Sequence, residues 1–440
     1  MVKSQFDSKL ILLSGFVGGL IALFFYPYWV GDLVAPLSYS GRVIYPADNF
    51  MYQAHANTYS FASIQAPAIL YKLGLSSREI SLFLSFLSGA LGFAAASATA
   101  MLFSRHWVLV MSAPFILLAM RQRLPGHNYT LNFPSTEQVG GAIAMFTLWL
   151  LLVLVCQGRG RVVWFFVGFM PALHATLAAY LWFLIGVFLL VTDQVAAYAK
   201  KYWKSFSVGI LAFLASFTFY WLARIEPAAT DPVAGAKILR EFDVRWSHHL
   251  APLKLSVLQG DFYFVALCLL ILWAERKRPA VPFTVFLKIC CWANLFVIPF
   301  VLVFNVFLPE VLPHTLRTVM VNRWLNLNAL ILPIIYFSYL FLIGIERGHR
   351  WLALLSLGVL AVAIRLKMNL QAPVSSFLTP LVGAVREGNV AGLFSTLYYN
   401  PLIVGVIIAG GILWLRKPGG GFTPSQKKIA SFVWVLILTL

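Results

Sequence analysis

The chain has 440 residues, of which 60% are hydrophobic and only 11% charged, and its mean hydropathy is +0.83. This composition excludes an ordinary soluble globular protein and predicts a helical membrane protein with many spans, because the apolar stretches run on over about 20 residues. The formal charge of +18 does not indicate nucleic-acid binding, since Lys and Arg form short clusters between the apolar segments.

The apolar segments predict an all-α, polytopic transmembrane helical bundle of about 11–13 spans, which we expect to form a single membrane domain over residues 1–440. The first segment is expected to stay as an anchor because no small-residue cleavage pattern follows it. The segments are 10–30, 80–103, 107–120, 139–157, 162–192, 206–223, 257–274, 282–307, 327–345, 351–365, 400–415 and 429–440.

Segment 162–192 is too long for one ordinary span and too short for two full ones, since each half would rise only about 22 Å. Its fold follows from the basic connectors 159–161, 200–204, 275–278, 346–350 and 416–428. These connectors all fall on the cytoplasmic side only if the segment folds back as a short broken hairpin with its tip near Pro171 and His174. One long tilted helix is the alternative, and it would invert the topology after residue 193.

Lys3 and Lys9 indicate a cytoplasmic N-terminus, so the long polar loop after the first segment is expected on the outer face of the membrane. The outer loops are then 31–79, 121–138, 224–256, 308–326 and 366–399. Lys and Arg in outer loops run against the usual bias and indicate an anionic partner there.

The helix-start signature of Ser135 and Gln138 predicts a capped fourth span. Cys156, Cys268, Cys290 and Cys291 lack zinc or disulfide spacing, and we assign them to packing.

Arginine and histidine residues lie just above the expected spans in two of the outer loops. Guanidinium groups bind phosphate oxygens bidentately, so these residues are candidate ligands of a lipid phosphate. Alternatively, these side chains contact only the headgroups of membrane lipids and bind no substrate. The residues are Arg245, His248, His249, Arg317 and Arg323.

The first outer loop carries Asp32, Asp48 and His55. Asp48 is the candidate general base for transfer of a sugar to a hydroxyl, because a carboxylate on an ordered loop can take the proton. Asp32 is a candidate second carboxylate or a ligand of a divalent cation, and His55 is a candidate substrate contact. An ordinary turn around Pro46 and Asp48 is the alternative. His174, within an apolar run, is expected to line a cavity or to pack in the core.

The order YPADNF, FPSTEQ, PALHATL, RWSHHLAP and RTVMVNRW resembles a group of bacterial polytopic proteins akin to the GT-C class of membrane glycosyltransferases, over about residues 10 to 345. The resemblance implies transfer of a sugar from a polyprenyl-phosphate donor to a glycan or lipid acceptor, at the extracytoplasmic face of the bacterial inner membrane. Asp48 then matches the class's acidic residue. Many members have two adjacent acids, whereas Asn49 follows Asp48, so the use of Mg²⁺ or Mn²⁺ stays open.

Three other functions fit the same observations. An O-antigen polymerase or ligase would use the outer arginines and histidines without Asp48. A transporter or flippase of a lipid-linked anion would use the broken helices and His174. A noncatalytic membrane subunit of a complex is the third. In each case the partners are membrane lipids and lipid-linked substrates, and no nucleic acid is expected.

Overall fold

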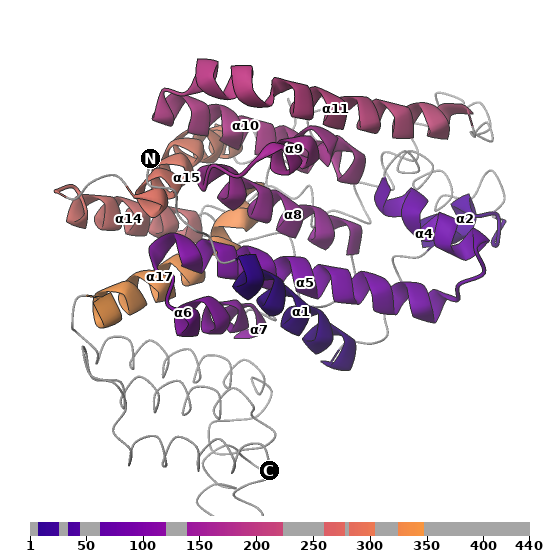
Figure 1. Ribbon diagram of the computed structural model, residues 1–440, viewed down its shortest axis with the longest axis horizontal. Coiled ribbons are helices and arrows are strands. Elements are labelled where there is room, and N and C mark those ends of the chain that lie inside the picture. The colour runs from indigo at the N-terminus through magenta and orange to yellow at the C-terminus, as the bar shows by residue number, and fades with distance from the viewer. Residues whose placement is uncertain are drawn as a thin grey trace, which may run out of the picture. The chain divides into compact units, whose positions relative to one another are not determined.

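The computed structural model describes residues 8–25, 34–44, 62–119, 139–222, 259–277, 281–303 and 324–346, and all regular elements among them are helical (Figure 1). The all-α class expected from the sequence is confirmed for this part of the chain. Contacts divide the chain into two compact units, Met1–Tyr336 and Phe337–Leu440, and the boundary lies inside the last described helix. The contacts discussed below lie within the first unit, and α17 enters them through its residues up to Tyr336.

Most of the helices follow the expected apolar segments to within a few residues. Those that do are α1 (Ser8–Phe25), α5 (Ser77–Phe103), α6 (Trp107–Ser112), α7 (Ile116–Ala119), α8 (Val139–Cys156), α14 (Gln259–Ala274), α15 (Pro282–Val301) and α17 (Asn326–Glu346). A 3₁₀ turn at Ala113–Phe115 joins α6 to α7. The segments beyond residue 346 lie outside the part of the chain that the structure describes.

Two sequence-based boundaries were wrong. Helix α11 (Val195–Leu222) begins well before residue 206, so the basic run at 200–204 that we expected to be a connector lies within its first turns. The first outer loop is also not all loop, because α2 (Val34–Tyr39) and α4 (Ala62–Lys72) form within it. The sequence signal for the end of this loop was Ser76 and Glu79, which make a capping box at the start of α5.

The expected hairpin is present in segment 162–192. Helix α9 (Arg161–Leu173) ends at His174, whose extended backbone separates it from α10 (Ala175–Thr192). The indole N–H of Trp182 donates to the Val167 carbonyl oxygen at 2.8 Å, and these residues lie about equally far from His174 along the chain. The second helix therefore folds back along the first. Pro171 does not end α9, which continues two residues beyond it.

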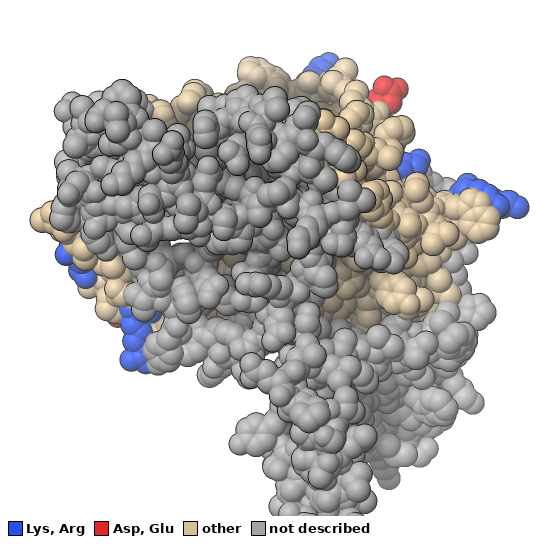
Figure 2. All heavy atoms as spheres, turned by 180° about the vertical axis from the view of Figure 1, so that it is seen from behind, with Lys and Arg blue, Asp and Glu red and all other residues tan. Residues whose placement is uncertain are grey.

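Four of the described helices are long and apolar enough to cross a membrane: Ser77–Phe103, Ala175–Thr192, Pro282–Val301 and Asn326–Gly344. Large apolar side chains are also exposed on the surface of the bundle, among them Leu211 and Leu214 of α11 and Trp292 and Phe296 of α15. Exposed apolar surface of this extent is typical of a lipid-facing protein. Figure 2 shows the charged side chains at the edges of the described surface, with uncharged residues between them. Together these features indicate an integral membrane protein.

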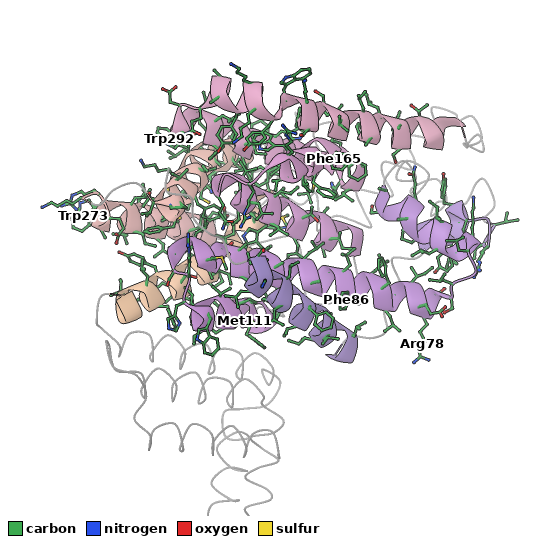
Figure 3. All side chains as sticks on the ribbon, viewed as in Figure 1. Arg78, Phe86, Met111, Phe165, Trp273 and Trp292 are labelled. Carbon is green, nitrogen blue, oxygen red and sulfur yellow. The ribbon has the colours of Figure 1, made fainter. Side chains whose placement is uncertain are left out.

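The ends of the helices in the first unit gather at two opposite ends of the bundle. At one end, Phe103 of α5 stacks on Phe283 of α15 with ring centroids 4.8 Å apart, and Trp164 of α9 stacks on Tyr202 of α11. We call this the basic end. Its Lys and Arg residues are Lys9, Arg105, Arg159, Arg161, Lys200, Lys201, Lys204, Arg276 and Lys277. Helices α2 and α4 lie at the opposite end, which we call the loop end (Figure 1). Trp273 and Arg78 mark the two ends in Figure 3.

Helices α9 and α11 approach so closely that glycine is required at their contact. A Cβ added at Gly168 would collide with the carbonyl oxygen of Phe206, and one at Gly209 would collide with that of Phe165. Small residues at such contacts let helix backbones pack together in a membrane, where apolar side chains gain little from leaving lipid. This contact holds the first helix of the hairpin against α11.

We predict that Gly168→Ala destabilises the protein by about 1–3 kcal/mol, because the added methyl group forces α9 and α11 apart. The matched control is Gly186→Ala in α10, where an added Cβ meets nothing within 4 Å. Alanine favours the helix, so this control is expected to be neutral or slightly stabilising. Thermal unfolding of the two purified variants in detergent measures the difference. Equal melting temperatures for both would contradict the close approach of the two helices.

Candidate functional site

The described part of the first outer loop is anchored to the loop end of the bundle through α4. The Ser63 hydroxyl donates to the carbonyl oxygen of Leu173, next to the break at His174. The Ser216 hydroxyl of α11 donates to Oε1 of Gln65 at 2.8 Å. Tyr71 of α4 packs in one buried cluster with Ile80 and Leu84 of α5 and Ile143 of α8. These contacts bring the first loop to the tip of the hairpin.

Arg42 holds the short helices of this loop together. Its guanidinium group donates to the Tyr71 and Leu75 carbonyl oxygens at 2.7 and 3.3 Å, at the C-terminal end of α4. It also lies 5.3 Å from the centre of the Tyr71 ring. Burial raises the pKa of Tyr71, whereas its hydrogen bond to Ser77 and the Arg42 charge lower it. Tyr71 is therefore a neutral donor to Ser77 at physiological pH. One cation of this loop thus has a structural role.

A buried polar network lies between α14, α15 and α17. Asn328 donates from Nδ2 to Oδ1 of Asp261 at 2.8 Å, and the side-chain amides of Asn328 and Asn294 hydrogen-bond to each other. Asn294 also donates to the Cys290 carbonyl oxygen, one turn earlier in its own helix. The exposed fractions are 0% for Asp261, 2% for Asn294 and 3% for Asn328. We call these three residues the Asp261 network.

The Asp261 network lies in the halves of α14, α15 and α17 that point away from the basic end. Asp261 and Asn328 are each the third residue of their helices, and Asn294 lies seven residues before the end of α15. At a rise of 1.5 Å per residue, that is about 10 Å below the end of the helix. A carboxyl group inside an apolar membrane bundle is costly, and it normally marks a functional site.

Aromatic rings border the network on the side of α10. Trp324 stacks on Tyr180 with centroids 4.9 Å apart and planes 10° from parallel, and it also stacks on Phe183. Tyr180 is 1% exposed, and Phe183 lies edge-on to Phe296 of α15, two residues from Asn294, with ring centroids 6.3 Å apart. A buried acid, carboxamides and flat aromatic rings therefore gather in one place. Such a combination can orient a polar ligand by hydrogen bonds while the rings exclude water.

His174 is the one sequence-predicted site residue that the structure describes. It is half-buried, and its backbone accepts from Ala178 N–H and donates to the Met170 carbonyl oxygen, linking both helices of the hairpin. It lies next to Leu173, whose carbonyl oxygen accepts from Ser63 of α4. The other predicted site residues lie outside the described residues: Asp32, Asp48, His55, Arg245, His248, His249, Arg317 and Arg323. The proposed cap at Ser135 and Gln138 also lies outside them.

Sequence reasoning missed the Asp261 network although a signal was available. Asp261, Asn294 and Asn328 lie within or at the start of expected spans, where a polar side chain needs a partner. Among the sequence-based expectations, only His174 is named as a polar side chain that needs such a partner. Within the described ranges, no three His, Cys, Asp or Glu residues gather as ligands of a metal ion. All four cysteines are free, and Cys268, Cys290 and Cys291 are buried, which agrees with a packing role.

No protein-family model, curated protein or solved structure matches this chain. The class that the described residues define is an all-helical protein with helices able to span a membrane and a buried acid and amide network.

We predict that Arg42→Lys loosens α4, because a lysine ammonium cannot donate to two carbonyl oxygens from a planar fork. Hydrogen–deuterium exchange should be faster in peptides that cover residues 69–75. Arg105→Lys, which changes an exposed arginine at the basic end, is the control and should leave these peptides unchanged. Identical exchange in wild type and Arg42→Lys would contradict this role for Arg42.

We predict a favourable coupling of about 0.5–3 kcal/mol between Asn294 and Asn328, since each amide is the other's hydrogen-bond partner. Unfolding of Asn294→Ala, Asn328→Ala and the double variant in detergent measures it. Each single variant should be less stable than wild type, because the remaining amide stays buried and loses a hydrogen-bond partner. Additive losses in the double variant would show that the two amides do not interact.

Proposed function

We propose that this chain is an integral membrane glycosyltransferase of the GT-C type, which transfers a sugar from a polyprenyl-phosphate donor at the loop end of the bundle. The observation that carries the proposal is the Asp261 network, because it sets a carboxyl group and carboxamides into the interior of an apolar bundle. A lipid-linked sugar needs this pairing of environments. Its polyprenyl chain requires apolar surface, and its headgroup requires hydrogen-bonding groups.

The distribution of charge supports an orientation with the basic end in the cytoplasm. Lys200, Lys201 and Lys204 of α11 and Arg276 and Lys277 after α14 lie at this end. Clusters of Lys and Arg near the ends of spans stay on the cytoplasmic side. The loop end then faces outward, and the membrane is the bacterial inner membrane in this proposal. Lys9 at the start of α1 belongs to the same end, so the N-terminus is cytoplasmic.

The chemistry proposed for the loop end is a displacement at the anomeric carbon of the donor sugar. The acceptor hydroxyl oxygen forms the new glycosidic bond to that carbon, and the bond to the phosphate oxygen breaks with its electron pair. The carboxylate of Asp48 takes the hydroxyl proton. The polyprenyl phosphate leaves as an anion, and Arg245, His248, His249, Arg317 and Arg323 are proposed to bind it. Asp32 and Asp48 would hold a divalent cation if the reaction uses one.

The anchoring of α4 supports a role for the first loop in this reaction. Contacts of Ser63 with Leu173 and of Gln65 with Ser216 fix the end of the loop that follows Asp48 and His55 in sequence. A catalytic group contributes to the rate only when it is held in position against its substrate. His174, next to Leu173, is proposed to line a substrate cavity.

We predict that Asp48→Asn lowers the rate of transfer by about 10²–10⁴-fold without changing the melting temperature, because the amide cannot accept the hydroxyl proton. The assay measures transfer of labelled sugar from a panel of polyprenyl-phosphate donors by purified protein in detergent. Asp193→Asn is the matched control, since this exposed acid lies near the basic end and asparagine tolerates its positive φ of 51°.

Two results would contradict the proposal in different ways. Wild-type rates for Asp48→Asn would remove Asp48 as the base while leaving a transferase. No transfer with any donor in detergent, together with movement of a lipid-linked anion across reconstituted liposomes, would identify a transporter. The second result would overturn the proposed function as a whole.

A further inference from the structure

The first turn of α17 carries buried polar atoms that the protein does not satisfy. Asn326 is 2% exposed, and neither its side-chain oxygen nor its side-chain nitrogen has a hydrogen-bond partner within the described structure. The indole nitrogen of Trp324, two residues earlier, is also buried without a partner there. Asn328, two residues later, belongs to the Asp261 network. Unpaired buried amides are rare, because each costs the free energy of desolvation.

These unpaired atoms select the kind of ligand that can bind. The Asn326 amide has two N–H donors and one acceptor oxygen, so its partner must both accept and donate. A metal cation satisfies the oxygen alone, and a phosphate satisfies the N–H groups alone. A hydroxyl group does both. Adjacent hydroxyl groups on a sugar ring fit this requirement.

The surroundings of Asn326 fit a sugar headgroup as well. Tyr180 and Phe183 of α10 stack with Trp324 and provide an apolar wall. Asn328 lies two residues later, on a different face of α17, and connects to Asp261 and Asn294; the amide N–H groups of this network are used within it, and its oxygens can still accept. Polar groups placed against aromatic rings fix the orientation of a ligand with both polar edges and apolar faces.

We infer that the first turn of α17, through Asn326, is the subsite that recognises the sugar hydroxyl groups of the lipid-linked donor. This inference rests on the proposed function and adds a location for its specificity. Asp48 and the outer arginines act on the reacting bond and the phosphate, whereas Asn326 distinguishes the sugar. The subsite predicts that binding depends on the sugar as well as on the lipid phosphate.

The test compares two ligands of the purified full-length protein in an alkyl polyoxyethylene detergent, which itself carries no sugar. One ligand is a short-chain polyprenyl-phosphate hexose, taken from a panel of stereoisomers, and the other is the same polyprenyl phosphate without sugar. We expect wild type to bind the best hexose ligand about tenfold or more tightly than the sugar-free one, as two or three hydrogen bonds allow. Asn326→Leu should bind both about equally.

Melting temperatures separate a binding role from a structural one. Asn326→Leu removes an unpaired buried amide, so the variant should melt at a higher temperature than wild type while it loses the preference for the sugar. Ser88→Ala is the matched control, because the Ser88 hydroxyl in α5 is also buried without a hydrogen-bond partner in the described structure. This control should also gain stability and should keep the sugar preference.

Three outcomes would overturn the inference. The first is a wild type with no preference for any hexose. The second is an Asn326→Leu variant that keeps the wild-type preference, which would show that ordered water alone satisfies the amide. The third is a Ser88→Ala variant that loses the preference equally. Each differs from failure of the proposed function. An Asn326-dependent sugar preference without transfer would retain the subsite and remove the enzyme, whereas transfer that depends on Asp48 but not on Asn326 would do the reverse.

Discussion

The arrangement of α14, α15 and α17 depends on the need to satisfy polar side chains inside an apolar bundle. Asp261 and Asn294 come from helices that could slide past one another if only apolar side chains met. Asn328 bonds to both of them, so the relative position of the three helices is fixed by hydrogen bonds. Apolar contacts fix the relative position of helices less well in a membrane, because lipid tails are as apolar as leucine side chains. The network therefore determines where Trp324 and Asn326 lie.

Close backbone contact fixes the other side of the bundle. Gly168 and Gly209 let α9 and α11 pack against each other, and the Trp182 bond to Val167 returns α10 along α9. The loop that follows α1 is then anchored where α9 ends, through Ser63. As a result, the break at His174 and the described part of the first loop lie together at the loop end. This common location is the structural basis of the proposed function.

Much of this fold was predictable from the sequence because the apolar segments are long and have clear ends. The hairpin at His174 followed from charge, since the basic connectors share one side only when the chain turns back there. The helix α4 was missed because Gln65, Pro67 and Ser63 make its sequence resemble a polar loop, and tertiary contacts with α9 and α11 are needed to see its role. The run at 200–204 was misplaced because lysines at a membrane surface are compatible with a helix as well as with a connector.

The candidate site was less predictable. A lone asparagine in a span, such as Asn294, gives no indication of its partner, and Asn328 lies 34 residues away in another helix. Two residues so far apart in the sequence form no local sequence motif that would predict their contact. Arg42 shows a related limit, because its sequence position indicated an outer-loop cation, whereas its two carbonyl contacts at the end of α4 give it a structural role.

The most direct measurement is a density map of the full chain in a lipid bilayer with a short-chain polyprenyl-phosphate hexose bound. We predict that the hexose lies within hydrogen-bond distance of Asn326 and that its phosphate lies between Arg245 and Arg317. The carboxylate of Asp48 should lie beside the anomeric carbon. A hexose bound away from the first turn of α17, with Arg245 and Arg317 pointing apart into solvent, would contradict it.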